Sequence, residues 1–189
     1  MSPTIICPKR HGDPRGWFSE TWNEERFAAA GIAVRFCQDN QSYSKAKGTL
    51  RGLHCQRPPS AQAKLVRCLQ GRIFDVAVDV RRASPTFGQW VAAELSADDG
   101  RQLFIPAGYA HGFLTLSDDC MVAYKVDAYY SAEDDGGIAW NDPAIRIDWP
   151  IDSEPVLSDK DMKLPALREL TAEFPYDGQP LAPLREISF

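Results

Sequence analysis

Histidine, paired cysteines and long apolar runs are all scarce in this sequence. Only three histidines occur, at positions 11, 54 and 111, and none of the five cysteines belongs to a C-x-x-C pair. The cysteines are odd in number and widely spaced, which argues against a disulfide framework and against a zinc site. We therefore expect free cysteines in a reducing compartment and a cytoplasmic protein.

Two further absences narrow the class of partner. No stretch approaches the roughly 18 apolar residues of a membrane helix, and the N-terminal MSPTIICPKRHG lacks the apolar region of a signal peptide. Basic residues are not in excess, since 21 Lys and Arg face 26 Asp and Glu. We expect a soluble, non-exported protein with no nucleic-acid or membrane partner. Any ligand that carries phosphate would have to bind at a local cluster of basic side chains.

What remains is the composition of one globular domain. The 189 residues are 44% hydrophobic and 25% charged, with no internal repeat or low-complexity segment. This length suffices to bury a substantial core. We expect a single domain over residues 1–189, in which the last ten residues form an appended tail.

Short strands dominate the predicted secondary structure. Residues 64–81 contain an apolar run, a Gln70-Gly71 turn and then strict alternation, which predicts a β-hairpin with one face on the core. Further strands are predicted at 90–95, 102–105, 111–116 and 121–126. Helix signals are short, at 23–31 with an Asn cap and near Ser158. The pattern predicts an all-β sandwich or barrel with short peripheral helices.

Ten short motifs carry a resemblance to a known family. They lie at residues 13–20 (DPRGWFSE), 38–40 (QDN), 50–54 (LRGLH), 64–67 (KLVR), 84–90 (SPTFGQW), 105–113 (IPAGYAHGF), 124–125 (YK), 129–130 (YY), 140–142 (WND) and 157–161 (LSDKD). In this order and spacing they resemble the dTDP-4-dehydrorhamnose 3,5-epimerase family over about residues 3–165, which leaves 166–189 as a C-terminal extension.

The resemblance implies a fold, an assembly and a reaction. The fold is a cupin-like double-stranded β-helix, or jelly-roll barrel, and the assembly is a homodimer in which each N-terminal region reaches into the partner's cavity. The implied activity is that of an isomerase that inverts C3 and C5 of a dTDP-linked 4-keto-6-deoxyhexose. Because the C4 ketone acidifies the hydrogens at both carbons, the inversion needs a base, an acid and an enolate stabiliser, but no redox cofactor.

The resemblance also assigns roles to residues. His54 matches the general base, Asp161 its carboxylate partner, Tyr124 the acid and Lys64 the enolate stabiliser. The unperturbed pKa values of histidine, about 6.5, and tyrosine, about 10, suit a base and a protonated acid near neutral pH. Substrate contacts are implied at Arg15, Glu20, Gln38, Asn40, Arg51, Lys64, His111, Tyr130, Asp135 and Lys160, with Tyr130 stacking on thymine and the cations Arg15, Arg51 and Lys160 among the residues that hold the substrate.

A metal site is not expected. Many cupins bind an ion through an H-x-H pair, but here the corresponding residues are His54-Cys55-Gln56, and a third histidine would have to be His11. Strand alternation also directs Cys55 away from the face that carries His54. We therefore predict neither a metal nor another cofactor.

Several alternatives stay open at this stage. They are a mono-epimerase acting on C3 or C5 of another 4-keto sugar, a non-catalytic sugar-nucleotide-binding cupin, a metal-dependent cupin oxygenase and a 3,4-ketoisomerase. Structural roles also compete with the functional ones: Ser158 and Asp161 have the spacing of a helix cap, and Arg67 and Arg81 are typical of solvated strand faces. Tyr129 and Tyr130 cannot both face a cavity from one regular strand.

Overall fold

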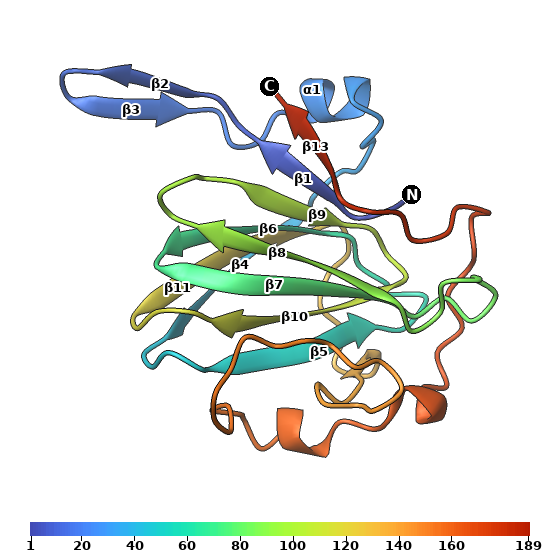
Figure 1. Ribbon diagram of the computed structural model, residues 1–189. Coiled ribbons are helices and arrows are strands. Elements are labelled where there is room, and N and C mark those ends of the chain that lie inside the picture. The colour runs from blue at the N-terminus through green and yellow to red at the C-terminus, as the bar shows by residue number, and fades with distance from the viewer.

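Two β-sheets pack face to face in the computed structural model, which describes residues 1–189 (Figure 1). The six-stranded sheet has the order β13 (Arg185–Ser188), β1 (Thr4–Cys7), β9 (Gln102–Ile105), β6 (Lys64–Gln70), β11 (Cys120–Val126) and β4 (Gln38–Ser44). The five-stranded sheet has the order β12 (Asp135–Gly137), β5 (Leu50–Gln56), β10 (Tyr109–Thr115), β7 (Arg72–Asp79) and β8 (Trp90–Ser96). The predicted all-β jelly roll is confirmed.

The hydrophobic core lies between the two sheets. Val66 and Cys68 of the six-stranded sheet pack there against Ile73 and Ala77 of β7. A second apolar cluster covers the outer face of the five-stranded sheet, beneath the segment that follows β12 (Figure 1). Because β7 is covered on both faces, six of its eight residues are buried. The expectation that only one face of this strand meets a core was therefore wrong.

The predicted hairpin over residues 64–81 is also wrong. Both strands form, but β6 pairs with β9 and β11 in one sheet, whereas β7 pairs with β10 and β8 in the other. The Gln70-Gly71 turn leads the chain from one sheet to the other. Gly71 has a positive φ of 78°, which glycine adopts without strain. A turn signal marks a change of direction but does not specify which sheet the next strand joins.

Helical structure is short and peripheral, as predicted. Helix α1 spans Glu24–Ala29, and the side chain of Asn23 caps it by accepting a hydrogen bond from the Arg26 amide. The signal near Ser158 yields a single 3-10 turn, η1 (Asp161–Lys163), in which Ser158 Oγ accepts from the Asp161 amide at 3.1 Å. A second such turn, η2, spans Leu167–Glu169. No helix is both long and apolar enough to cross a membrane.

The C-terminal residues are part of the sheet and not a detached tail. Strand β13 pairs in parallel with β1 (Figure 1). Phe189 packs against Phe27 of α1. Asp177, upstream of β13, pairs at 3.0 Å with Arg81. Arg81 is only 2% exposed and also bonds Asp79, so the expectation of a solvated arginine was wrong. Two carboxylates offset the cost of burying this cation.

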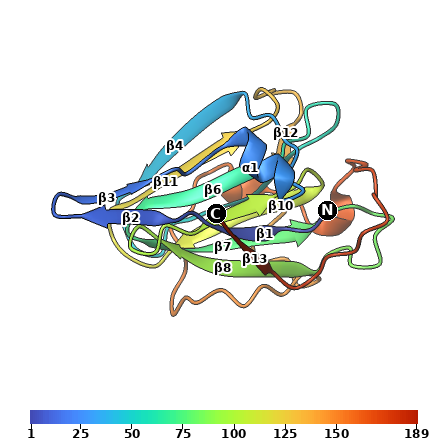
Figure 2. The same ribbon diagram turned by 90° about the horizontal axis from the view of Figure 1, so that it is seen from above.

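One element stands away from the sheets. Strands β2 (Arg10–Asp13) and β3 (Gly16–Ser19) form a two-stranded hairpin that projects beyond the body of the molecule in both views (Figures 1 and 2). Its Trp17 and Phe18 are largely exposed. Exposed aromatic side chains that are neighbours on a projecting arm are typical of an interaction surface.

Candidate active site

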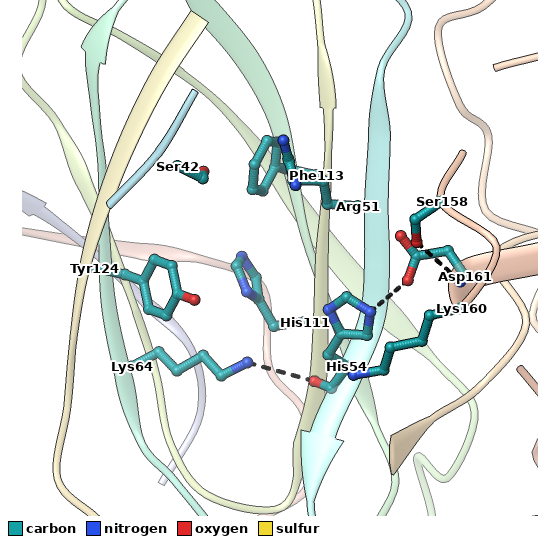
Figure 3. A pocket seen from close by; sticks show the side chains of 10 residues that line it. All are labelled: Ser42, Arg51, His54, Lys64, His111, Phe113, Tyr124, Ser158, Lys160 and Asp161. Atoms are coloured by element: carbon teal, nitrogen blue, oxygen red, sulfur yellow. Dashed lines mark hydrogen bonds and ion pairs between the residues drawn. The ribbon is translucent and has the colours of Figure 1, made fainter. Parts of the chain in front are cut away.

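A cavity of about 280 Å³ lies between the two sheets, and both contribute side chains to it (Figure 3). Its lining comprises Ser42, Arg51, His54, Lys64, His111, Phe113, Tyr124, Ser158, Lys160 and Asp161. A second hollow of about 200 Å³ shares four of these residues and adds Gln38, Asn40, Cys55, Gln56, Gln62, Tyr130 and Asp135. The two hollows together form one polar, elongated site.

A histidine and an aspartate pair at one wall of the cavity. His54 of β5 lies 2.5 Å through Nε2 from Oδ1 of Asp161, whose side chain is 5% exposed (Figure 3). Burial would raise the pKa of Asp161, but hydrogen bonds from His54 and Ser158 bring it below its ordinary value. The carboxylate is therefore ionised at neutral pH. It engages Nε2 and leaves Nδ1 as the nitrogen available to a substrate.

Lys64 supplies a buried cation. It lies on β6, and its Nζ makes one long hydrogen bond of 3.5 Å, to the carbonyl oxygen of His54 (Figure 3). Burial lowers the pKa of Lys64, while Cys55, Asp75 and Asp135 act in the opposite direction. An ammonium with so few protein acceptors is suited to stabilise a developing negative charge on a ligand oxygen.

Tyr124 stands across the cavity from His54 (Figure 3). It lies on β11 in the six-stranded sheet, whereas His54 lies on β5 in the five-stranded sheet. Burial raises the pKa of Tyr124, which keeps its hydroxyl protonated at neutral pH. A proton acceptor and a proton donor therefore approach the cavity from opposite sides.

A second histidine that lines the cavity, His111, pairs with an aspartate buried behind it. His111 of β10 contacts Oδ1 of Asp75 on β7 through Nε2 at 2.7 Å, and Asp75 is 0% exposed. Burial lowers the pKa of His111 even though Asp75 opposes this shift. The sequence reasoning missed Asp75, because an acidic residue in an alternating strand is usually solvated. It also missed Ser42 and Phe113, whose types carry no chemical signal.

The second hollow is organised by hydrogen bonds among residues that the sequence singled out. Gln38 donates to Asn40 Oδ1 at 2.9 Å and accepts from the Tyr130 amide at 3.1 Å. Asp135 Oδ2 accepts from the Tyr130 hydroxyl at 3.1 Å and from Lys160 at 2.5 Å. These contacts hold an exposed tyrosine ring beside a lysine at the open end of the site.

Arg51 lines the first hollow and is held there by two hydrogen bonds. Its Nε donates to Ser44 Oγ at 3.1 Å and its Nη2 donates to the Tyr43 carbonyl at 2.9 Å. Tyr129 and Tyr130 lie in a loop and not in a strand, so alternation does not govern which of them faces the site. Tyr130 lines the second hollow.

Arg15 and Glu20 lie outside the cavity of their own chain. Arg15 is in the turn of the projecting hairpin, where its side chain is 89% exposed and pairs with Asp13. Glu20 pairs with Arg26 at 3.3 Å. Every other sequence-predicted site residue lines one of the two hollows.

The side chains that a metal would need are separated. No group of three or more His, Cys, Asp or Glu side chains comes together as a metal-binding cluster. His11 lies in the projecting hairpin, and Cys55 is buried in the apolar cluster on the outer face of the five-stranded sheet. Burial raises the pKa of the Cys55 thiol to about 11. All five cysteines are free.

Comparison with known proteins identifies close relatives. A family model described as dTDP-4-dehydrorhamnose 3,5-epimerase matches residues 2–169. The dTDP-4-dehydrorhamnose 3,5-epimerase of Sinorhizobium fredii is 54% identical over 172 residues, which cover 91% of this chain and 88% of the relative.

Two solved structures are also similar. The dTDP-4-dehydrorhamnose 3,5-epimerase of Bacillus anthracis, with TDP and PPi bound, is 50% identical with a TM-score of 0.85, over 87% of this chain and 93% of that one. The dTDP-6-deoxy-D-glucose-3,5-epimerase of Legionella pneumophila, in complex with dTDP-4-keto-L-rhamnose, is 45% identical with a TM-score of 0.87, over 92% and 94%.

Proposed function

This chain belongs to the dTDP-4-dehydrorhamnose 3,5-epimerase family, and we propose that it is the isomerase that inverts C3 and C5 of dTDP-4-keto-6-deoxy-D-glucose to give dTDP-4-keto-L-rhamnose. The observation that carries the proposal is the placement of the His54–Asp161 pair opposite Tyr124, with Lys64 between the two sheets. A base and an acid on opposite sides of one cavity are what inversion at a carbon requires.

The proton removal falls to His54. Its free ring nitrogen takes the proton from C3 or C5, and the electron pair of the broken C–H bond moves into the sugar to give an enolate with its charge on O4. The ring becomes an imidazolium, and the buried carboxylate of Asp161 stabilises that positive charge. Lys64 stabilises the negative charge on O4.

The proton return falls to Tyr124. Its hydroxyl gives a proton to the opposite face of the same carbon, which converts the enolate back to the ketone with inverted configuration. Because burial raises the pKa of Tyr124, the acid is loaded before each step. The cycle moves protons only and changes no oxidation state, so it uses no redox cofactor, and proton exchange with water restores His54 and Tyr124.

The nucleotide part of the substrate is assigned to the open end of the site. Arg51 and Lys160 present cations to the diphosphate, and Tyr130 offers a ring face to thymine. Gln38, Asn40 and Asp135 supply polar contacts around that ring, and His111 contacts the sugar. Each of these residues lines the site.

Arg15 and Glu20 are assigned to a neighbouring subunit's site. Both lie on or beside the projecting hairpin, remote from their own cavity. We propose a homodimer in which this hairpin, with exposed Trp17 and Phe18, enters the partner's cavity. The proposed location is the cytoplasm, where the five widely spaced cysteines stay reduced.

The proposal is tested with dTDP-4-keto-6-deoxy-D-glucose in D₂O, with NMR detection of deuterium at C3 and C5. Wild type is expected to label and invert both carbons, and His54→Ala is expected to abolish both events. Glu94→Ala is the control, since this exposed side chain lies on the edge strand β8 and lines neither hollow. Labelling at one carbon would indicate a mono-epimerase, and no labelling would indicate a binding protein.

A further inference from the structure

The Asp75 carboxylate is a buried group that the proposed proton transfers do not use. It is 0% exposed, and its Oδ2 has no hydrogen-bond partner, whereas its Oδ1 contacts Nε2 of His111 at 2.7 Å. Burying a carboxylate with one oxygen unpaired is costly, and such groups call for an explanation other than stability.

The contact restricts which nitrogen of His111 carries the proton. A carboxylate only accepts, so Nε2 must hold the hydrogen. Burial lowers the pKa of His111, which favours the neutral ring, and a neutral imidazole with hydrogen on Nε2 has an unprotonated Nδ1. No other group of the chain bonds this ring, and the ring lines the cavity.

We propose that Asp75 is a positioning residue that fixes His111 with Nδ1 as a hydrogen-bond acceptor toward the bound sugar. The inference rests on the proposed function. It restricts the substrate, because the sugar atom opposite His111 must carry a hydroxyl hydrogen. A ketone or an ether oxygen at that place has no hydrogen to give and would face a second acceptor, which is unfavourable. Deoxygenated sugars at that position would leave Nδ1 unpaired.

The surroundings of the pair explain why a carboxylate is needed there. The charged or titratable groups that act electrostatically on His111 are Asp75, Lys64 and His54. Without Asp75, the positive charge of Lys64 would decide the tautomer of His111, because it favours the form whose unprotonated nitrogen points toward the ammonium. The aspartate overrides that preference from behind the cavity wall, where no substrate competes for it.

The tautomer is measured directly by ¹⁵N NMR of the imidazole nitrogens in the full-length protein without substrate. The chain has only three histidines, and comparison with His111→Ala assigns the relevant pair of signals. The expected result is a protonated Nε2 and an unprotonated Nδ1. A protonated Nδ1, or an imidazolium at pH 7.5, would overturn the proposal. This NMR measurement requires no turnover, so its outcome does not depend on whether the proposed activity is found.

A kinetic cycle tests the consequence. Asp75→Asn is expected to lower kcat/KM roughly tenfold and to give mixed tautomer signals, since an amide either donates or accepts. In a His111→Ala background the same change is expected to cost less than about twofold. If Asp75→Asn still lowers kcat/KM roughly tenfold in the His111→Ala background, Asp75 acts through Lys64 or stabilises the fold. That result would contradict the inference.

The matched control is Asp79→Asn. Asp79 is a fully buried carboxylate on the same strand, but it bonds Arg81 and Ser84 outside the cavity. Its loss is expected to lower Tm while leaving the tautomer and kcat/KM of the folded enzyme unchanged. If the two variants lose activity equally and in proportion to unfolded protein, Asp75 is structural.

Discussion

Replacing Asp161 with asparagine isolates the charge that faces His54. Asparagine has nearly the same shape, and its carbonyl still accepts a hydrogen bond from Nε2. What disappears is the negative charge 2.5 Å from the imidazole, on a side chain that is 5% exposed and thus poorly screened by water. The variant therefore removes stabilisation from the imidazolium formed after proton abstraction and changes the ground state less.

The size of the effect follows from that geometry. A hydrogen bond to a charged partner contributes about 1.5–3 kcal/mol. If this is realised only when the ring is protonated, kcat falls roughly 10- to 150-fold, because about 1.4 kcal/mol of activation free energy is tenfold in rate. KM is expected to change little, since Asp161 acts through His54.

The assay is the rate of deuterium incorporation at C3 and C5 by NMR, with Tm measured on the same samples. Ser158→Ala is the control, because Ser158 Oγ accepts from the Asp161 amide and its loss perturbs the same turn without removing the charge. A folded Asp161→Asn variant with kcat within twofold of wild type would refute the catalytic role of the pair.

Three further results are expected. Tyr124→Phe loses product formation roughly 10²- to 10⁴-fold while exchange of the C3 or C5 hydrogen with solvent persists, because His54 still removes and returns a proton on one face; undiminished inversion would contradict the assignment. Burial lowers the pKa of Lys64 and raises that of Tyr124, so Lys64 loses its proton first as pH rises. We expect kcat to fall at alkaline pH with a midpoint below the ordinary lysine pKa of 10.5. Lys64→Arg shifts that midpoint to higher pH, and an unshifted midpoint would point to another group. Arg15→Ala raises KM roughly tenfold with little change in kcat. In mixed dimers with His54→Ala subunits, one cavity combines an intact His54 with an intact Arg15 from the partner, so sites with the wild-type KM reappear. If each subunit used only its own Arg15, no such sites would form.

Local sequence was sufficient where local forces decide the structure. The strands at 102–105 and 121–126 and the Asn23 cap depend on alternation and on one hydrogen bond within four residues. The pairing of strands was different. Residues 64–81 were expected to fold back as a hairpin, but β6 and β7 joined separate sheets because their partners lie far away in sequence.

Local sequence patterns also failed to predict which charged side chains are buried. Arg81 was expected in solvent, yet it is buried because Asp79 and the distant Asp177 converge on it. Asp75 is buried for a similar reason, since its histidine partner comes from another strand. In both cases the compensating charge or hydrogen bond is supplied by a residue that no local pattern identifies.

The sequence by itself determined the residue types of the site, the strand-rich fold class and, through ten motifs in register, the family. Only the tertiary structure decided that His54 meets Asp161 107 positions later, that Tyr124 faces them from the other sheet, and that Arg15 lies outside its own cavity. The physical reason is that side-chain chemistry is local, whereas the distances and the low-dielectric burial that make it useful arise from packing between remote segments.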